Sequence, residues 1–201
     1  MRDNNKRKVI SVLSAIVPVR DTPSEWEMYD KLRAQLLYLG ADEVIVDSEP
    51  GGCAMARNRA SRKANGDIYL FIDADTWPNA PKGAYAKVLG TMDCDFWQPR
   101  TWVNKTASKY TQLSAWVLSF MSRLEIPTPI VAVAIRRDIF EAIGRWDETV
   151  TYEDWEIGRV LGSRDCRMGY LPGTIEVHRK WIWHNASHAS TRTHLKKYKY
   201  H

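Results

Sequence analysis

Residues 67–75 read Asp-Ile-Tyr-Leu-Phe-Ile-Asp-Ala-Asp, and this stretch decides the fold class of the chain. An unbroken run of five apolar residues between acidic ends is typical of a strand buried on both faces, as in a parallel sheet covered by helices. In such sheets ligands bind beyond the carboxyl ends of the strands. The stretch therefore also places two carboxylates, Asp73 and Asp75, where a ligand is expected.

Strands and helices alternate on either side of this stretch. The pattern predicts further strands over residues 9–19, 43–46, 95–101, 130–135, 167–171 and 175–178. It predicts helices over residues 22–39, 54–64, 81–89, 106–124, 138–143 and 152–161, with Thr22 as a cap, Pro23 in the first turn and Gly40 as a stop for the first of them. Because strands that alternate with helices build parallel sheets covered on both faces, we predict an α/β fold with a mainly parallel, Rossmann-like sheet.

The charge of the chain is concentrated at its two ends. The 201 residues carry a net charge of +5, of which residues 1–8 contribute +3 and residues 192–201 contribute +4, so that the remaining 183 residues sum to −2. A nucleic-acid binder usually carries its basic face on the folded body, so nucleic acid is not expected as a partner. The basic ends suit peripheral contact with an anionic membrane surface, or are solvated tails.

Cysteine usage and the first residues indicate a reducing interior. The chain has three cysteines and no C-x-x-C pair, which predicts neither a disulfide framework nor a zinc site. Residues 1–8 are polar and lack the apolar run of a signal peptide. We therefore expect a cytoplasmic protein, either free or peripheral on the inner membrane face.

Asp73-Ala74-Asp75 is the first candidate site. In an extended segment, residues i and i+2 point the same way, so the two carboxylates should face one spot and repel each other unless a cation lies between them. Carboxylate oxygens suit Mg²⁺ or Mn²⁺, which complete their coordination with substrate phosphates. A second triplet of the same form, residues 93–95, precedes its apolar stretch and is expected on the opposite edge of the sheet.

Three further positions have both a functional and an ordinary interpretation. Arg57 and Asn58 lie in the helix before the central strand and would reach the same edge. Arg57 is suited to phosphate or a nucleobase edge, and Asn58 can fix a loop or a ribose; otherwise Arg57 is an exposed helical arginine. Asp154 follows Glu153 in a first helical turn, where it is either a general base or a helix cap. His178 follows an apolar segment and is either a metal ligand or a surface histidine, and His184 and His188 compete for the first role.

Taken in order, these motifs resemble the family 2 glycosyltransferases of the GT-A fold, compact versions of which occur in archaea and their viruses. The resemblance covers roughly residues 8–180. The residues that carry it are a strand with a proline turn at Pro18, the acid Asp47 after the second strand, Ala56-Arg57-Asn58 with Ala64, Gly66-Asp67, Asp73-Ala74-Asp75 and Pro78, the strand 131–135 followed by Arg136-Arg137-Asp138, Gly144 with Trp146-Asp147-Glu148, and Glu153-Asp154.

The resemblance implies a single domain with a nucleotide-sugar-binding half at about residues 8–100, an acceptor half at about 101–180 and a basic aromatic tail at 181–201. It implies that a sugar passes from a nucleoside-diphosphate donor, UDP- or GDP-linked, to a hydroxyl of a glycan, protein or lipid acceptor, with inversion, and that Mn²⁺ or Mg²⁺ is the cofactor. The implied roles are a base for Asp154, metal binding for Asp73, Asp75 and His178, and substrate binding for Pro18, Arg20, Asp47, Arg57, Asn58, Asp73 and Glu153.

The chain departs from the family pattern at two places near the base pocket. Arg20 stands where a small polar residue is common, and Gly51-Gly52 follows Asp47 early. Rival functions are a retaining transferase on the same fold, a sugar-phosphate nucleotidyltransferase, which would need a glycine-rich triphosphate loop, and a non-catalytic module that binds sugar or a membrane through Trp181 and Trp183.

Overall fold

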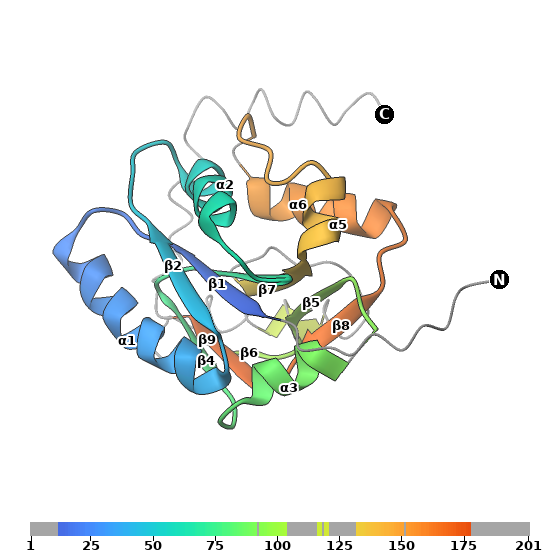
Figure 1. Ribbon diagram of the computed structural model, residues 1–201, viewed down its shortest axis with the longest axis horizontal. Coiled ribbons are helices and arrows are strands. Elements are labelled where there is room, and N and C mark those ends of the chain that lie inside the picture. The colour runs from blue at the N-terminus through green and yellow to red at the C-terminus, as the bar shows by residue number, and fades with distance from the viewer. Residues whose placement is uncertain are drawn as a thin grey trace.

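The computed structural model describes residues 12–91, 93–103, 116–117, 119–120, 132–150 and 152–177. In chain order the elements are β1 (Leu13–Pro18), α1 (Pro23–Leu39), β2 (Glu43–Asp47), α2 (Cys53–Lys63), β3 (Ile68–Ile72), β4 (Thr76–Asn79), α3 (Ala84–Thr91), β5 (Phe96–Pro99), β6 (Trp102–Val103), β7 (Ala132–Arg136), α5 (Arg137–Ala142), α6 (Glu153–Ser163), β8 (Met168–Leu171) and β9 (Thr174–Val177). Figure 1 shows their arrangement in space.

Two sheets organise the chain. The larger one has six strands in the order β2-β1-β3-β7-β5-β8, and the smaller one has the order β4-β9-β6. In the large sheet β7 runs antiparallel to both of its neighbours, whereas β1 pairs in parallel with β2 and β3, and β5 pairs in parallel with β8. Five strands therefore point one way, and the predicted mainly parallel α/β sheet is confirmed.

Helices cover both faces of this sheet, with α1 and α3 on one side and α2, α5 and α6 on the other (Figure 1). Alternate residues of the strands enter two separate cores. On β3, Ile68, Leu70 and Ile72 pack toward α1 and α3, and Tyr69 and Phe71 pack toward α2, α5 and α6. Burial on both faces is the physical reason for the unbroken apolar run in the sequence.

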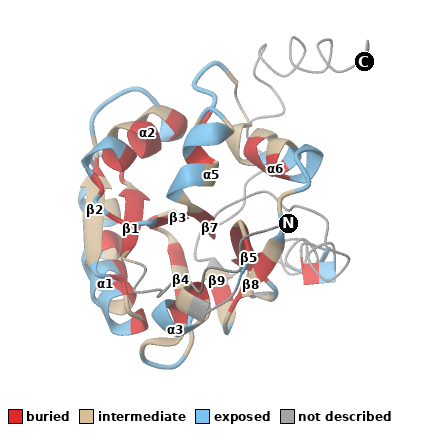
Figure 2. Ribbon diagram, turned by 45° about the vertical axis from the view of Figure 1, so that its right-hand side comes forward, coloured by how far each residue is buried: buried red, intermediate tan, exposed pale blue. Residues whose placement is uncertain are grey.

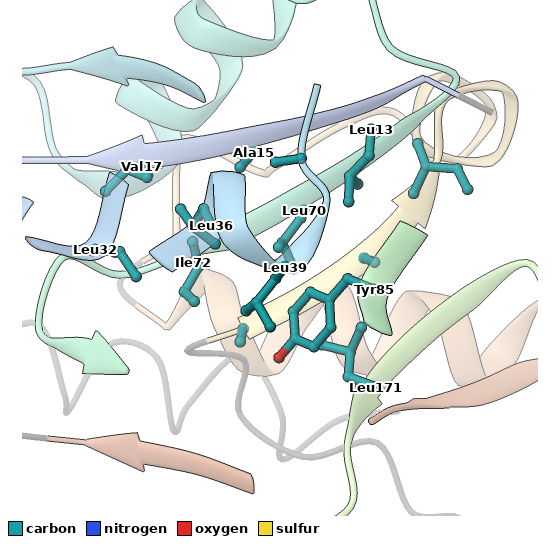
Figure 3. Close-up of a cluster of buried hydrophobic side chains, with 14 of the residues drawn as sticks. Leu13, Ala15, Val17, Leu32, Leu36, Leu39, Leu70, Ile72, Tyr85 and Leu171 are labelled. Atoms are coloured by element: carbon teal, nitrogen blue, oxygen red, sulfur yellow. The ribbon is translucent and has the colours of Figure 1, made fainter. Parts of the chain in front are cut away.

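The core under α1 and α3 is mainly aliphatic. One stripe of α1, made by Tyr29, Leu32, Leu36 and Leu39, is buried, and Figure 3 shows its leucines against side chains of β1 and β3, with Tyr85 of α3 at the end of the cluster. The opposite core is aromatic, because the rings of Phe71, Phe140 and Trp146 lie in contact there. Figure 2 shows the buried strands between helices whose outer surfaces are exposed.

The predicted ends of α1 are confirmed. Thr22 Oγ1 accepts a hydrogen bond from Glu25 N at 3.4 Å, Pro23 opens the helix, and Gly40 closes it with a φ of 102°. Other boundaries differ from the predictions: α3 begins at Ala84 and α6 continues through Gly162 to Ser163. The predicted strand 95–101 is shortened to β5, and the unpredicted β6 follows it. Of the predicted helix 106–124, the described residues 116–117 and 119–120 are helical, and the rest lies outside the described residues.

Strand β4 was not predicted, because Thr76-Trp77-Pro78-Asn79 contains a proline and lacks a period-2 apolar pattern. Its partner β9 runs antiparallel to it, and Thr76 pairs with Val177. The reason given for the shared direction of Asp73 and Asp75 was also wrong. Residues 73–76 form a reverse turn, in which Thr76 N donates to the carbonyl oxygen of Asp73 at 3.0 Å, so strand alternation does not apply there. Among the described helices, none is long and apolar enough to cross a membrane.

Candidate active site

Three predicted site residues meet at one edge of the large sheet. Strands β1, β2 and β3 are parallel, Pro18 at the end of β1 pairs with Asp47 at the end of β2, and Asp73 directly follows β3. The duplicate triplet 93–95 lies at the opposite edge, because Asp95 precedes β5 and its carbonyl oxygen accepts from Arg136 N at the far end of β7. The strand ends thus separate the two triplets as expected.

Arg57 connects this edge to the first turn of α6. Its Nη2 donates to Asp73 Oδ1 at 2.7 Å and its Nη1 donates to Glu153 Oε1 at 3.0 Å. The side chain is only 3% exposed. Burial alone would lower the pKa of Arg57, but the charges of Asp73, Cys53 and Glu153 outweigh it and raise that pKa. Arg57 is therefore a buried cation between two acids, and the alternative of an exposed helical arginine is wrong.

The loop between α5 and α6 packs against the Arg57 guanidinium through Trp146. The Arg57 guanidinium carbon lies 4.5 Å from the ring centroid of Trp146, a cation–π contact. Asn58 fixes the backbone of the same residue from both sides, since its Nδ2 donates to Trp146 O at 2.9 Å and its Oδ1 accepts from Trp146 N at 3.2 Å. Nδ2 also donates to Glu148 Oε1 at 2.8 Å. Of the two roles predicted for Asn58, fixing a loop or binding a ribose, the described residues thus show the first.

We predict that Asn58→Ala lowers the stability of the protein by about 2–3 kcal/mol, because it leaves the buried N–H and C=O of Trp146 without partners. Thermal or denaturant unfolding measures the loss. Asn65→Ala is the matched control, since the Asn65 amide is exposed and makes a single long contact, 3.4 Å, to Glu43; it should change stability by no more than about 0.5 kcal/mol. Equal losses for the two variants would contradict the role given to Asn58.

Asp154 lies in the first turn of α6, next to Glu153. Burial raises the pKa of Asp154 to about 6, repulsion from Glu153 and Asp73 adds to the effect, and the Trp155 N–H and Arg57 oppose it. The Trp155 N–H donates to Asp154 Oδ1 at 2.9 Å. This bond satisfies an N–H of the first helical turn, so the capping interpretation of Asp154 stays open beside that of a base; Thr151, the other residue of the predicted capping spacing, lies outside the described residues. A carboxylate that protonates near pH 6 suits a general base at neutral pH.

Asp47 lies at the predicted edge but is covered. Its side chain is 1% exposed, and Arg59 donates to it through Nη2 at 2.6 Å and through Nε at 3.1 Å and 3.3 Å. Arg59 also donates to the carbonyl oxygens of Glu49 and Pro50, which fixes the loop after β2. The sequence analysis missed Arg59, because nothing distinguishes it there from the exposed Arg62 and Lys63. Contact between Asp47 and a nucleotide stays a prediction, and would require Arg59 to move or to share the carboxylate.

Arg20 and Asp75 lie on the solvent side of the same edge. Arg20 is paired with Glu25 through both its backbone N–H, at 2.6 Å, and its Nε, at 2.5 Å. The bond to Glu25 is the largest of the effects that raise the pKa of Arg20, and the charges of Cys53 and Asp75 add to it. Asp75 is half-buried.

The acids of the turn suit a divalent cation by their chemistry. Within the described residues, no group of three or more His, Cys, Asp or Glu side chains could hold a metal ion by itself. Two carboxylates that leave further positions to phosphate oxygens are a usual arrangement for Mg²⁺. That Asp73 and Asp75 supply them stays a prediction, and Arg57 occupies one oxygen of Asp73. The predicted third ligand, His178, lies outside the described residues; β9 ends at Val177, which pairs with Thr76, the neighbour of Asp75.

A cavity of about 390 Å³ lies on the other side of Trp146, between α6 and the loop after α5. Its lining includes Glu148 and Glu156 but not Asp73, Asp75 or Asp154. The cavity therefore does not coincide with the cluster of interacting charges, and the candidate site is defined by those charges.

No family model matches the chain, and no curated protein matches it in sequence. Solved structures do match. The mannosyltransferase PcManGT from Pyrobaculum calidifontis, in complex with GDP-Man and Mn²⁺, has a TM-score of 0.57 at 14% identity over 84% of this chain and 57% of its own. TarS from S. aureus has a TM-score of 0.59 at 15% identity over 83% of this chain and 60% of its own. The chain thus spans about three fifths of the length of these structures, and it shares its α/β fold with them.

Proposed function

We propose that this protein is a glycosyltransferase that moves a sugar from a nucleoside-diphosphate sugar to an acceptor hydroxyl with inversion. The observation that carries the proposal is the cluster of Asp73, Arg57, Glu153 and Asp154. The buried Arg57 bonds both Asp73, at the edge proposed for the donor, and Glu153, the direct neighbour of Asp154, whose pKa is raised to about 6. The shared fold with a mannosyltransferase solved with GDP-Man and Mn²⁺ supports the donor class.

In this proposal, Asp73 and Asp75 hold the metal-bound diphosphate of a UDP- or GDP-linked sugar, with His178 as a further ligand. Mn²⁺ or Mg²⁺, when bound, neutralises charge on the leaving diphosphate. Asp154 takes the proton of the acceptor hydroxyl while the oxygen bonds to the anomeric carbon and the bond from that carbon to the phosphate oxygen breaks. Pro18, Arg20 and Asp47 border the nucleotide, and the acceptor is a glycan, protein or lipid hydroxyl at a cytoplasmic or membrane-peripheral location.

A thermal-shift screen of nucleoside diphosphates with Mn²⁺ and Mg²⁺ tests the donor side. A ligand at 100 times its dissociation constant stabilises a protein by about 2.7 kcal/mol, which for a chain of this size raises the melting temperature by about 5–10 °C. We expect such a rise for UDP or GDP with metal, and none for the metal or the nucleotide alone. If no nucleoside diphosphate raises the melting temperature in the presence of either metal, the proposed donor class is wrong.

The anomeric configuration of the product tests the stereochemistry. Single displacement with Asp154 as base predicts inversion, which NMR of the glycoside reads directly. A product of retained configuration would show that the protein is a retaining transferase and that Asp154 does not act as proposed.

A further inference from the structure

Arg57 joins three separate parts of the chain at one point. It projects from α2, bonds Asp73 in the turn after β3, and bonds Glu153 at the start of α6, which lie 16 and 96 residues away in sequence. Trp146 covers the guanidinium from the loop before α6. Arg57 is thus the side chain through which the donor edge of the sheet contacts the helix turn that carries Asp154.

Arginine suits this place by its shape as well as its charge. Its planar, fixed fork directs one N–H at each of two acids, whereas a lysine ammonium is a point charge on a flexible stem. Because the fork is buried against Trp146, both bonds form in a dry environment where charge-assisted hydrogen bonds are strong. The guanidinium is nearly inaccessible, so a direct contact with the nucleotide, which the family resemblance implies for Arg57, is not what its surroundings favour.

We infer that Arg57 is a positioning residue, which fixes the first turn of α6 against the donor-side acid and so holds the proposed base Asp154 in place for the acceptor. The inference rests on the proposed function and extends it to a residue that acts through its neighbours. It has an electrostatic consequence, since the groups that act on Asp154 are Arg57 from α2, Asp73 from the turn after β3, and Glu153 with the Trp155 N–H from α6 itself.

Substitution of Arg57 and substitution of Glu153 should shift the pKa of Asp154 in opposite directions, because the two residues carry opposite charges. Arg57→Gln removes one of the two groups that stabilise the Asp154 carboxylate, the other being the Trp155 N–H, so the pKa of Asp154 rises and the acid limb of the pH–rate profile moves to higher pH. Glu153→Gln removes a repelling charge, so that pKa falls and the limb moves to lower pH. A loss of packing alone would not move the two limbs in opposite directions.

Arg57→Lys separates charge from geometry. It keeps a cation near Asp154 but lacks the rigid planar fork that directs one N–H at each of Asp73 and Glu153, so we expect the acid limb to stay close to its original position. The value of kcat should nevertheless fall by about 100-fold, the cost of a misplaced group. Arg62→Gln is the matched control on the same helix; Arg62 is exposed, and both kcat and the acid limb should remain unchanged.

The experiment is a pair of measurements on each variant that melts cooperatively: the pH–rate profile of sugar transfer, and the titration of the Asp154 carboxyl followed by NMR in the protein alone. Opposite shifts for Arg57→Gln and Glu153→Gln in both measurements support the inference. Shifts in the same direction, or none, overturn it, and so does an Arg57→Lys variant with full kcat.

If the wild-type protein transfers no sugar, the proposed function fails, and the NMR titration still decides whether Arg57 controls the pKa of Asp154. If Arg57→Gln does not fold, Glu153→Gln and Arg57→Lys decide the outcome.

Discussion

Asp154→Asn is expected to lower the rate of sugar transfer by about 10²–10⁴-fold, the usual contribution of a general base. The amide keeps the size of the side chain and its hydrogen bond from the Trp155 N–H, but it cannot take the proton of the acceptor hydroxyl. Donor affinity should change little, because Asp154 is assigned to the acceptor side. Steady-state kinetics with separate variation of donor and acceptor measures both effects.

Asp138→Asn is the matched control for this variant. Asp138 lies in the first turn of α5 as Asp154 lies in that of α6, and its Oδ1 likewise accepts from the next backbone N–H, that of Ile139, at 3.0 Å. Asp138 is exposed and paired with Arg136 at the opposite edge of the sheet. Full activity of Asp138→Asn together with a large loss for Asp154→Asn supports the assignment of Asp154 as the general base. An Asp154→Asn variant with wild-type kcat would exclude that assignment.

Asp75→Ala is expected to abolish metal-dependent donor binding. Changes to groups that only orient a metal ligand cost 10–100-fold in affinity, so loss of a ligand itself should cost about 100-fold or more. Calorimetric titration of nucleoside diphosphate in the presence of Mn²⁺ should show no heat of binding at concentrations that saturate the wild-type protein.

The second Asp-x-Asp triplet of the chain supplies the control for this measurement. Asp93 has the same local sequence pattern but lies at the far edge, where Arg167 Nη2 donates to it at 2.9 Å. Asp93→Ala should therefore bind donor and metal like the wild type. An Asp75→Ala titration that matches that of Asp93→Ala would exclude Asp75 as a metal ligand.

Local chemistry made the strands and the first helix predictable. The five apolar residues of β3, and Thr22, Pro23 and Gly40 around α1, act on their own neighbours, so the sequence suffices to locate them. Strand β4 was missed because its structure comes from pairing with β9, which lies about 100 residues further along the chain. Pairing of that kind leaves no pattern in a single sequence when the strand is short and contains proline.

For the site, too, the positions that follow from local sequence were predictable, and the contacts that depend on tertiary packing were not. The edge at which Asp47 and Asp73 lie followed from strand direction alone. The partners of the charged residues did not, because Arg57 meets Glu153 and Arg59 meets Asp47 only through the packing of α2 against the sheet. The acids of the site and Arg57 could be located from the sequence, whereas Arg59 and the bonds that both arginines make to those acids could not.

The reversed direction of β7 determines where the chain leaves and re-enters the large sheet. Because β5 and β7 are antiparallel neighbours, with Trp97 opposite Ala134, the chain leaves the large sheet after Pro99 and re-enters it at Ala132 along the edge where Asp73 lies. Two points that lie more than 30 residues apart in the sequence therefore meet at the same edge as Asp73, and every strand of the large sheet keeps its register on either side of them.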